Sequence, residues 1–308
     1  MHKFISTLAL GLLGFSLTLN LAHAADVKPL RVLLITGGCC HDYSKQKDIL
    51  EQGLEERANV VVDQIHTEIP AGTSATKPPL PIYGNPNYAK GYDVVIHDEC
   101  ASDINDPTII KGVLAPHRAG TPRVNPLHSP KGKEQYSLAP HRRGIPGVNL
   151  HCAMHCYRIG NPNEQATAGS ERAMWFDYLG LQSSAHGAQL PIAIRFTDKT
   201  HALTHGLGDW TTVNEELYNN IQIFPTAKPL ARGTQTTKKK DGTTKEDDYV
   251  VAWANDYHGT RVFSTTIGHN NATVEDARYL DLVTRGLLWA CGKLDNKGNI
   301  KRGYGPKK

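Results

Sequence analysis

Apolar runs alternate with helix-forming stretches along the first half of the chain. The run LRVLLIT at 30–36 is apolar throughout and rich in β-branched residues, which is typical of a strand buried on both faces. Asp106 and Pro107 stand where an N-cap and a first helical residue would begin a later helix. We expect strands at 30–36, 59–66, 92–99 and 147–152, and helices at 43–57 and 106–120. This alternation predicts a mainly parallel sheet with right-handed crossovers.

The second half of the chain alternates less regularly and favours strands joined by short turns. Gly242 and Gly259 lie in the turns KKDGTTK and DYHGTR, where a hairpin needs positive φ. The expected strands are 190–198, 227–233, 249–256 and 260–268, and the expected helices are 171–181 and 274–292. No linker divides the chain, so we expect one α/β domain at 25–295, with an antiparallel extension in its C-terminal half and a basic tail at 296–308.

The first 24 residues have the pattern of a secretion signal. Lys3 precedes an apolar run, and AHA at 22–24 is a cleavage site of small residues. A retained membrane anchor is the alternative, but the apolar run is short for a spanning helix. No later segment is long and apolar enough to span a bilayer. We therefore expect cleavage after Ala24, a periplasmic or secreted mature chain, and no stable membrane insertion after cleavage.

Charge and cysteine spacing narrow the class of protein further. The formal net charge is +4, and the basic run in KKKDGTTKEDD at 238–248 is followed at once by acids, which indicates a solvated loop and no nucleic-acid partner. The spacing of the six cysteines does not indicate a disulfide framework. Cys39 and Cys40 are expected to be packing residues, with a redox pair as the alternative, and Cys152 and Cys156 to be small buried residues.

A short repeat lies before the fourth expected strand. Residues 114–125 and 138–149 agree at nine of twelve positions. Pro122, Pro126 and Pro130 each remove a backbone donor from the first copy, so we assign the second copy to the sheet and place an inserted loop at 121–137. Whether the repeat is a biological duplication or a sequence artefact is left open.

Histidines and acids follow several of the expected strands. They occur in TGGCCHDY at 36–43, HDE at 97–99, LHCAMHC at 150–156 and IGHNN at 267–271. In open α/β folds, functional side chains gather at the carboxyl ends of the strands. We therefore expect His41 and His269 to belong to a pocket there.

The stretch GVNLHCAMHC has the form of a sharp turn from a strand into a helix. Such an elbow needs small residues two positions before and after its apex. With Cys152 at the apex the flanks would be the bulky Leu150 and Met154, whereas with His151 they are Asn149 and Ala153. The sequence thus predicts His151 at the exposed point of the turn.

Five motifs in this order resemble the ThuA-like family, named for trehalose utilisation. They are RVLLITGG followed by a histidine, GVNLHCAMHC, THALTHGLGDW with NEELYNN, DYHGTRVFSTTIGHN, and a last helix ending LLWACG. The resemblance covers nearly all of the mature chain. It implies a flavodoxin-like, doubly wound and mainly parallel sheet similar to that of the class I glutamine amidotransferases.

The resemblance also assigns residues. His151 stands where the amidotransferases have a nucleophilic cysteine, which speaks against thiol amidotransfer. His269 matches their catalytic histidine, His41 comes from the first strand-end motif, and Glu216 and Tyr218 match an acidic-Leu-Tyr signature. The implied role is in carbohydrate metabolism, on trehalose, other disaccharides or their keto derivatives.

These observations lead to one functional hypothesis. Four residues are expected to exchange protons with a small-molecule carbohydrate, by hydrolysis, lysis or isomerisation: His41, His151, His269 and Glu216. Four more are expected to bind the substrate: Asp42, Tyr218, His155 and Trp210.

Two alternatives to this hypothesis stay open. One is a metal-assisted hydrolase, in which a divalent ion is held by His41, His151 and His155, with Glu99 or Asp98. The other is a non-catalytic, sugar-binding accessory protein. Apart from this candidate divalent metal the sequence identifies no cofactor, and it indicates neither the exact substrate nor the oligomeric state.

Overall fold

The computed structural model describes residues 27–69, 71–72, 74–118 and 144–307. The expected signal peptide at 1–24 and the expected inserted loop at 121–137 lie outside the described residues. In the part of the chain that is described, no helix has the length and apolar character needed to cross a membrane.

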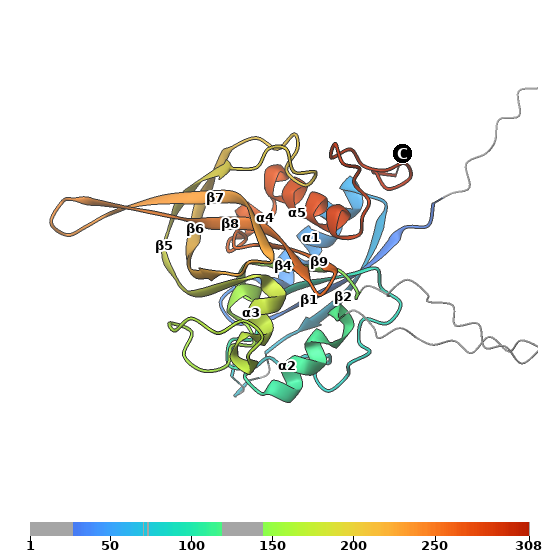
Figure 1. The fold of residues 1–308 in the computed structure, drawn as a ribbon, viewed down its shortest axis with the longest axis horizontal. Helices are drawn as coiled ribbons and strands as arrows, with labels where there is room; N and C mark the ends of the chain where they lie inside the picture. The colour runs from blue at the N-terminus through green and yellow to red at the C-terminus, as the bar shows by residue number, and fades with distance from the viewer. Residues whose placement is uncertain (1–26, 70, 73, 119–143, 308) are drawn as a thin grey trace, which may run out of the picture.

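A single mixed sheet runs through the described chain, in the strand order β2-β1-β3-β4-β9-β8-β7-β5-β6 (Figure 1). The strands are β1 Leu30–Gly38, β2 Val60–Thr67, β3 Val94–Cys100, β4 Gly147–Leu150, β5 Leu181–Phe196, β6 Trp210–Ile223, β7 Ala227–Lys238, β8 Thr244–Tyr257 and β9 Thr260–Thr265. Strands β2, β1, β3, β4 and β9 pair in parallel, and β9, β8, β7, β5 and β6 pair antiparallel. The mixed α/β sheet with an antiparallel C-terminal extension is confirmed.

Helices cover both faces of the parallel strands (Figure 1). They are α1 Tyr43–Arg57, α2 Pro107–Leu114, α3 Met174–Leu179, α4 Asn271–Val274 and α5 Ala277–Ala290. Because side chains alternate along a strand, Val32 and Leu34 of β1 join one apolar cluster with α1 and α5, whereas Leu33 and Ile35 join another with α2 and α3. This two-sided core explains why the strand at 30–36 is apolar throughout.

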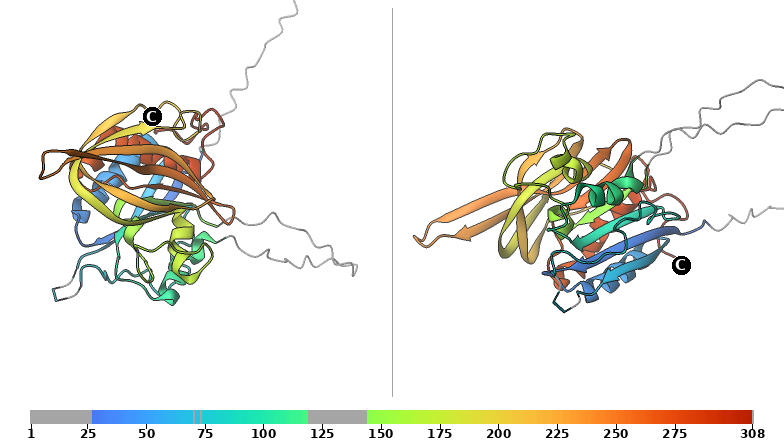
Figure 2. Two further views of the ribbon diagram at one scale, coloured as in Figure 1. Left: turned by 60° about the vertical axis from the view of Figure 1, so that its left-hand side comes forward. Right: turned by 90° about the horizontal axis from the view of Figure 1, so that it is seen from below.

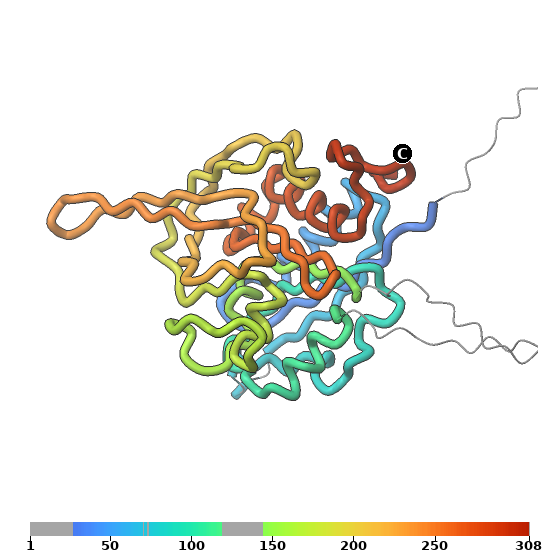
Figure 3. The backbone as a smooth tube through the Cα atoms, viewed as in Figure 1, coloured from blue at the N-terminus to red at the C-terminus, as the bar shows by residue number. Residues whose placement is uncertain are grey.

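Local signals fixed several boundaries as expected. The Asp106 side chain accepts a hydrogen bond from the Thr108 amide at the start of α2, and Pro107 is the first helical residue. Gly292, just past the end of α5, has φ of +68°. Gly242 and Gly259 have φ of +84° in the β7–β8 and β8–β9 hairpins. The β7–β8 hairpin projects from the rest of the described chain (Figures 2 and 3).

Other boundaries differ from the sequence prediction. The helix expected at 106–120 ends at Leu114 and continues as one 3-10 turn, Ala115–His117. The helix expected at 171–181 is a 3-10 turn, Glu171–Ala173, followed by the short α3. Gly180, with φ of +83°, ends α3 and allows β5 to begin at Leu181, well before the expected residue 190. Strand β6 was not expected, because its many polar residues hide the period-two alternation.

The basic segment after α5 packs back onto the domain. Leu294 and Ile300 form an isolated antiparallel bridge. The side-chain amide of Asn59 donates to the carbonyl of Gly303, and the backbone amide of Asn59 donates to the carbonyl of Tyr304. The segment therefore covers the amino end of β2.

A buried polar network lies under α2, on the face of the sheet that α2 and α3 cover. His97 contacts both Glu99, at 2.9 Å, and His117, at 3.2 Å between the two Nε2 atoms. The ring of His117 also contacts the Ile145 carbonyl through Nδ1, at 2.7 Å. Burial, with repulsion from His97, lowers the pKa of His117 to about 3.

This lowered pKa predicts a loss of stability in acid. Below about pH 6.5 the unfolded chain protonates His117 whereas the folded chain does not, so the free energy of unfolding falls by about 1.4 kcal/mol per pH unit until about pH 3. The variant His117→Gln should be less stable at pH 8, but its free energy of unfolding should fall less steeply between pH 6.5 and pH 4. Urea titrations between pH 8 and 4 measure it, and parallel curves for the variant and the parent would contradict the assignment.

Candidate functional site

Four of the expected site residues meet at the carboxyl edge of the parallel strands. His41 follows β1, His151 follows β4 and His269 follows β9, and these three strands end at the same edge. Glu216 comes from β6, in the antiparallel half of the sheet. One ligand atom from each of the four residues lies within 4.8 Å of the others. The curvature of the sheet thus brings residues from distant parts of the sequence into one cluster.

The turn at His151 is an elbow, as the sequence predicts. His151 has φ of +40°, in the left-handed region that a β-carbon disfavours, and a 3-10 turn begins there. The side chain is only 1% exposed, however, so the expectation of an exposed apex is wrong. The ring is buried because Tyr218, His41 and His269 pack around it.

The glycine before His269 allows the third histidine to approach. Gly268 has φ of +131°, and a β-carbon there would lie 2.7 Å from the Tyr279 hydroxyl and 3.5 Å from the β-carbon of His151. Only glycine fits this backbone conformation and this spacing. Glu215, fully buried, then accepts hydrogen bonds from the amides of His269 and Asn270 and fixes the turn after β9.

Hydrogen bonds to the backbone define which nitrogens face the centre of the cluster. Nδ1 of His41 lies 3.1 Å from the Cys39 carbonyl, and Nδ1 of His151 lies 2.7 Å from the Thr266 carbonyl. A carbonyl oxygen only accepts, so both Nδ1 atoms donate to the backbone and both Nε2 atoms face the centre of the cluster. Metal-binding histidines have this arrangement, with the outer nitrogen donating to a carbonyl.

Two of the inward-facing ring nitrogens lack hydrogen-bond partners. Among the described residues, no group hydrogen-bonds to Nε2 of His41 or to Nδ1 of His269, although both atoms are buried. Nε2 of His151 and Nδ1 of His269 each lie 3.5 Å from Oε2 of Glu216. Ring nitrogens of three histidines and a carboxylate oxygen thus surround one point. The cluster therefore has the donor set of a cation site.

The protonation states also suit a cation. Burial, with repulsion from His151 and His269, lowers the pKa of His41 to about 2. Burial and His151 likewise lower the pKa of His269. Burial of Glu216 acts to raise the pKa of its carboxyl group. The hydrogen bond and charge of His151, together with the charges of His186 and His269, outweigh burial and lower this pKa to about 2. His41 is therefore neutral and Glu216 ionised at neutral pH, as metal ligands must be.

Aromatic stacking holds the cluster from the side of β6. The buried Tyr218 hydroxyl lies 3.3 Å from Nε2 of His151. Its ring stacks on His155 at 4.2 Å and on His186 at 5.5 Å between centroids. His155 in turn contacts the Ser183 hydroxyl at 3.0 Å. Tyr218 and His155 thus position His151. His155 itself lies outside the cluster of four possible metal ligands, although the sequence made it a candidate ligand.

A cleft of about 540 Å³ opens beside the cluster. Its wall is formed by Cys40, His41, Asp42, Gln189, Val213, Asn214, His269, Asn270, Asn271 and Ala272. Asp42 is one of the lining residues. One of its carboxylate oxygens accepts a hydrogen bond from the Asn271 side-chain amide, and this bond contributes most to lowering the pKa of Asp42 to about 2. Side-chain amides at the rim offer both donors and acceptors, which matches the hydroxyl groups of a sugar.

Three residues named in the sequence hypotheses lie elsewhere. Trp210, at the start of β6, packs in the core under the guanidinium of Arg278, 4.7 Å from its ring centroid. Glu99, an alternative metal ligand, instead contacts His97 and accepts from Tyr157 in the network under α2. Asp98 is buried and its pKa is raised by that burial, so it does not supply an anion to the cluster.

Some site residues were not found from the sequence. Gln189 lies 2.7 Å from Nε2 of His269 and donates to Glu216, and Nδ1 of His186 lies 3.6 Å from Glu216. Both come from the irregular part of β5, ahead of the strand expected to begin at residue 190. No motif marks them, so only recognition of the longer strand could have found them.

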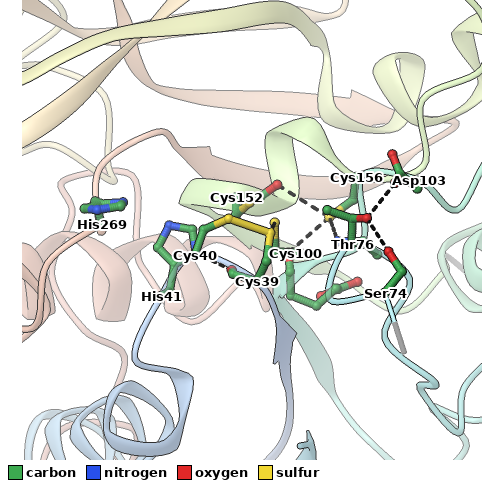
Figure 4. Close-up of a disulfide and its surroundings, with 12 residues drawn as sticks. Cys39, Cys40, His41, Ser74, Thr76, Cys100, Asp103, Cys152, Cys156 and His269 are labelled. Carbon is green, nitrogen blue, oxygen red and sulfur yellow. Dashed lines mark hydrogen bonds between the residues drawn. A yellow bond between two sulfur atoms is a disulfide. The ribbon is translucent and has the colours of Figure 1, made fainter. Parts of the chain in front are cut away.

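The cysteines near His41 differ from the sequence prediction. Cys39 and Cys40 were expected to be packing residues, but a disulfide joins them (Figure 4). The turn after Gly38 brings the two sulfur atoms together, with Cys40 at φ of +78°. Cys152 and Cys156 are buried, as expected.

Comparison with known proteins agrees with the motif order. Residues 163–290 match the ThuA family. That family is described by trehalose utilisation, and the match includes Glu216, Tyr218 and His269, whereas His41 and His151 lie outside it. The resemblance inferred from the sequence is thus confirmed. The search of curated proteins gives no match.

One solved structure supports the ThuA-like fold, and two others are less similar. A protein described as ThuA-like from Parabacteroides merdae ATCC 43184 is 19% identical over 91% of this chain and 98% of its own, with a TM-score of 0.56. The cytoplasmic protein STM3548 from Salmonella typhimurium is 10% identical over 85% of this chain and 99% of its own, with a TM-score of 0.45. The β-galactosidase from Rahnella sp. R3 is 12% identical over 85% of this chain and 31% of its own, with a TM-score of 0.45.

Proposed function

We propose that this ThuA-like chain is a metal-dependent enzyme of carbohydrate metabolism. It would hydrolyse, cleave or isomerise trehalose or a keto-sugar, and it would not carry out glutamine amidotransfer. The observation that carries the proposal is the convergence of His41, His151, His269 and Glu216, with unpartnered ring nitrogens directed at one carboxylate. In this proposal the four residues that the sequence predicted as proton donors and acceptors bind a metal ion instead.

Proton transfer by the histidines alone is a weaker explanation. A general acid or base works best when its pKa lies near the working pH. The pKa of His41 at about 2 leaves its ring neutral and too weak a base to take a proton at neutral pH. A neutral imidazole with a free lone pair is, however, what a transition metal binds.

The donor set indicates a divalent first-row transition metal. Three imidazole nitrogens and one carboxylate oxygen suit zinc, iron, cobalt or nickel better than calcium or magnesium. Ligand atoms about 2.1 Å from an ion lie at most about 4.2 Å apart, so the four atoms, now within 4.8 Å, need only a small closure. Gln189 can turn its amide so that its oxygen accepts from Nε2–H of His269, which frees Nδ1 for the ion.

The surrounding residues supply the remaining chemistry. A bound ion would act as a Lewis acid on a water, hydroxyl or carbonyl group that enters from the cleft. His186 is part-exposed and lies 3.6 Å from Glu216, outside the proposed ligand set, so it can exchange a proton with the reacting group and with solvent. The Tyr218 hydroxyl, 3.3 Å from Nε2 of His151, would hold that ring in position.

The cleft and the family support a sugar as substrate. Gln189, Asn214, Asn270 and Asn271 line one wall beside the cluster, and Val213, 49% exposed, offers an apolar contact for a ring face. The ThuA match adds trehalose utilisation as the biological setting. A role as a non-catalytic sugar-binding protein would use the same wall but would need no ion.

Two further parts of the proposal concern export and fold. We propose that residues 1–24 are a signal peptide and that the mature chain is periplasmic or secreted, which agrees with a disulfide between Cys39 and Cys40. The order β2-β1-β3-β4-β9, with helices on both faces, supports the finer proposal of a flavodoxin-like, doubly wound parallel half.

Metal removal tests the proposed function. Dialysis against a chelator should abolish turnover of trehalose or a keto derivative of it, and one equivalent of zinc, cobalt, nickel or iron(II) should restore it. Mass spectrometry of products with each ion measures the recovery. Unchanged turnover after complete metal removal would contradict the proposal, and tight sugar binding without product under every condition would favour the accessory protein.

A further inference from the structure

Five of the six cysteines gather next to the candidate metal site. They come from the ends of three neighbouring parallel strands: Cys39 and Cys40 after β1, Cys100 at the end of β3, and Cys152 and Cys156 after β4. Figure 4 shows their sulfur atoms side by side, next to His41. Cys291, at the end of α5, is the only cysteine outside this group.

Cys156 has a structural role within the group. Its thiol accepts a hydrogen bond from the Ala101 amide and lies 3.0 Å from the Glu99 carbonyl, so it ties η2, the 3-10 turn His151–His155, to the end of β3. It is fully buried. The other four cysteines of the group form the Cys39–Cys40 disulfide and the two buried thiols of Cys100 and Cys152. The structural role of Cys156 does not explain the disulfide.

One thiol lies in contact with the disulfide. Sγ of Cys100 is 3.4 Å from Sγ of Cys39, a separation typical of atoms poised to react. Pairing of Gly38 with Cys100 across β1 and β3 fixes this approach. Cys100 is buried, whereas Cys40 is exposed and lines the mouth of the cleft. The leaving sulfur of an exchange would therefore be released on the substrate side.

We propose that Cys39, Cys40 and Cys100 form a thiol–disulfide exchange site. The Cys100 thiol loses its proton, its sulfur bonds to Sγ of Cys39, and the Cys39–Cys40 bond breaks. Cys40 leaves as a thiolate and takes up the proton. One disulfide bond breaks as another forms, so the number of thiols and disulfides is unchanged and no external oxidant or reductant is needed. It replaces a disulfide within one loop by one that joins β1 to β3.

The exchange also changes the metal site, and this consequence rests on the proposed function. Cys40 precedes His41, and the Cys39 carbonyl accepts from Nδ1 of His41. Freeing Cys40 places a thiol beside the proposed ligands, at the rim of the cleft. The thiol there is open to modification by an external electrophile or disulfide, so the site can respond to the thiol state of its surroundings.

Trapping with iodoacetamide tests the exchange in the native protein without added reductant. Each time Cys40 is released, alkylation removes it and draws the reaction toward the Cys39–Cys100 linkage. Non-reducing peptide mapping should show carbamidomethyl-Cys40 and a Cys39–Cys100 peptide that increase together with time. Cys40 that stays unlabelled, with only the Cys39–Cys40 loop found after prolonged incubation, would overturn the proposal.

Variants separate exchange from simple exposure. Cys100→Ser should lose Cys40 labelling entirely, whereas Cys291→Ser should label at the parent rate. Cys40→Ser gives a second route if Cys100→Ser does not fold, because air oxygen should then oxidise Cys39 and Cys100 to one disulfide. Cys40 labelling that persists without Cys100, or a Cys40→Ser protein that keeps both thiols free, counts against the site.

The metal proposal can fail without affecting this result. The peptide map requires no metal ion. If the protein exchanges disulfides but binds no metal, the proposed exchange site stands and only its effect on a metal site is lost. Cobalt titration of the trapped and untrapped protein then tests the link. A shift in the cobalt absorption spectrum on trapping is expected, and identical spectra would show that the exchange leaves the cluster unchanged.

Discussion

Glu216→Gln is expected to lower the affinity for a divalent ion by more than about 100-fold and to abolish sugar turnover. Losing only an outer-shell partner of a metal ligand costs about 10- to 100-fold in affinity, and Glu216 is the one anion in the proposed ligand set. Glutamine keeps the size and shape of the side chain but removes its charge. Competition titration with a zinc chelator measures the affinity, and steady-state kinetics measures kcat.

Two matched histidine variants make this result specific. His258→Asn changes an exposed histidine in the β8–β9 turn, with φ of +52°, and should leave metal affinity and turnover at the parent values. His186→Gln should lower kcat while metal affinity stays close to that of the parent, because the ring contacts Glu216 from outside the ligand set. Full metal affinity in Glu216→Gln would show that the carboxylate is not a ligand.

Gly38→Ala is expected to destabilise the fold by more than about 3 kcal/mol. Gly38 has φ of +108°, a conformation that only glycine adopts readily. A β-carbon would lie 2.1 Å from the Cys100 carbonyl oxygen, so β1 and β3 would have to separate. That separation would also part Cys39 from Cys100 and displace His41. The free energy of unfolding from urea titration at pH 7 measures the effect.

Gly84→Ala provides the control for backbone strain alone. Gly84 also has positive φ, +73°, but a β-carbon there would meet no atom within 4 Å. Its cost should be about 1 kcal/mol, the ordinary penalty of a left-handed residue. Equal losses in the two variants would mean that the contact between β1 and β3 is not the cause.

The parallel half of the fold could be predicted because each of its signals is local. Continuous apolar runs mark strands buried on both faces, and Asp106 with Pro107 marks the start of α2. The antiparallel half was harder, since its strands carry polar residues that face the cleft. Strand β6 holds Glu215 and Glu216 within WTTVNEELYNNIQI, where buried acids interrupt the expected alternation of apolar and polar residues. Its identity as a strand depends on pairing with β5, which is non-local.

The candidate site was predictable in part for the same reason. His41, His151 and His269 follow parallel strands, so the strand-end rule brings them together. Glu216 was found only through the ThuA resemblance, and His186 and Gln189 were not found. The buried position of His151 could not be predicted either, because it depends on Tyr218 from the other half of the sheet.

Assignments made from spacing alone gave mixed results. His155 was a metal candidate because it lies four residues after His151, but a 3-10 turn and stacking on Tyr218 direct it to Ser183. Trp210 was assigned to the substrate because it lies near NEELY in sequence, yet an extended strand carries it into the core near Arg278. Sequence proximity thus failed where the local structure was misjudged.

Anomalous diffraction from crystals grown with cobalt or zinc tests the central claim most directly. We predict one strong peak at the metal edge, bonded to Nε2 of His41, Nε2 of His151, Nδ1 of His269 and Oε2 of Glu216. The protein used should show one equivalent of metal by elemental analysis. A peak bonded instead to the thiols of Cys100 and Cys152, or no peak at full metal loading, would contradict the proposed metal site.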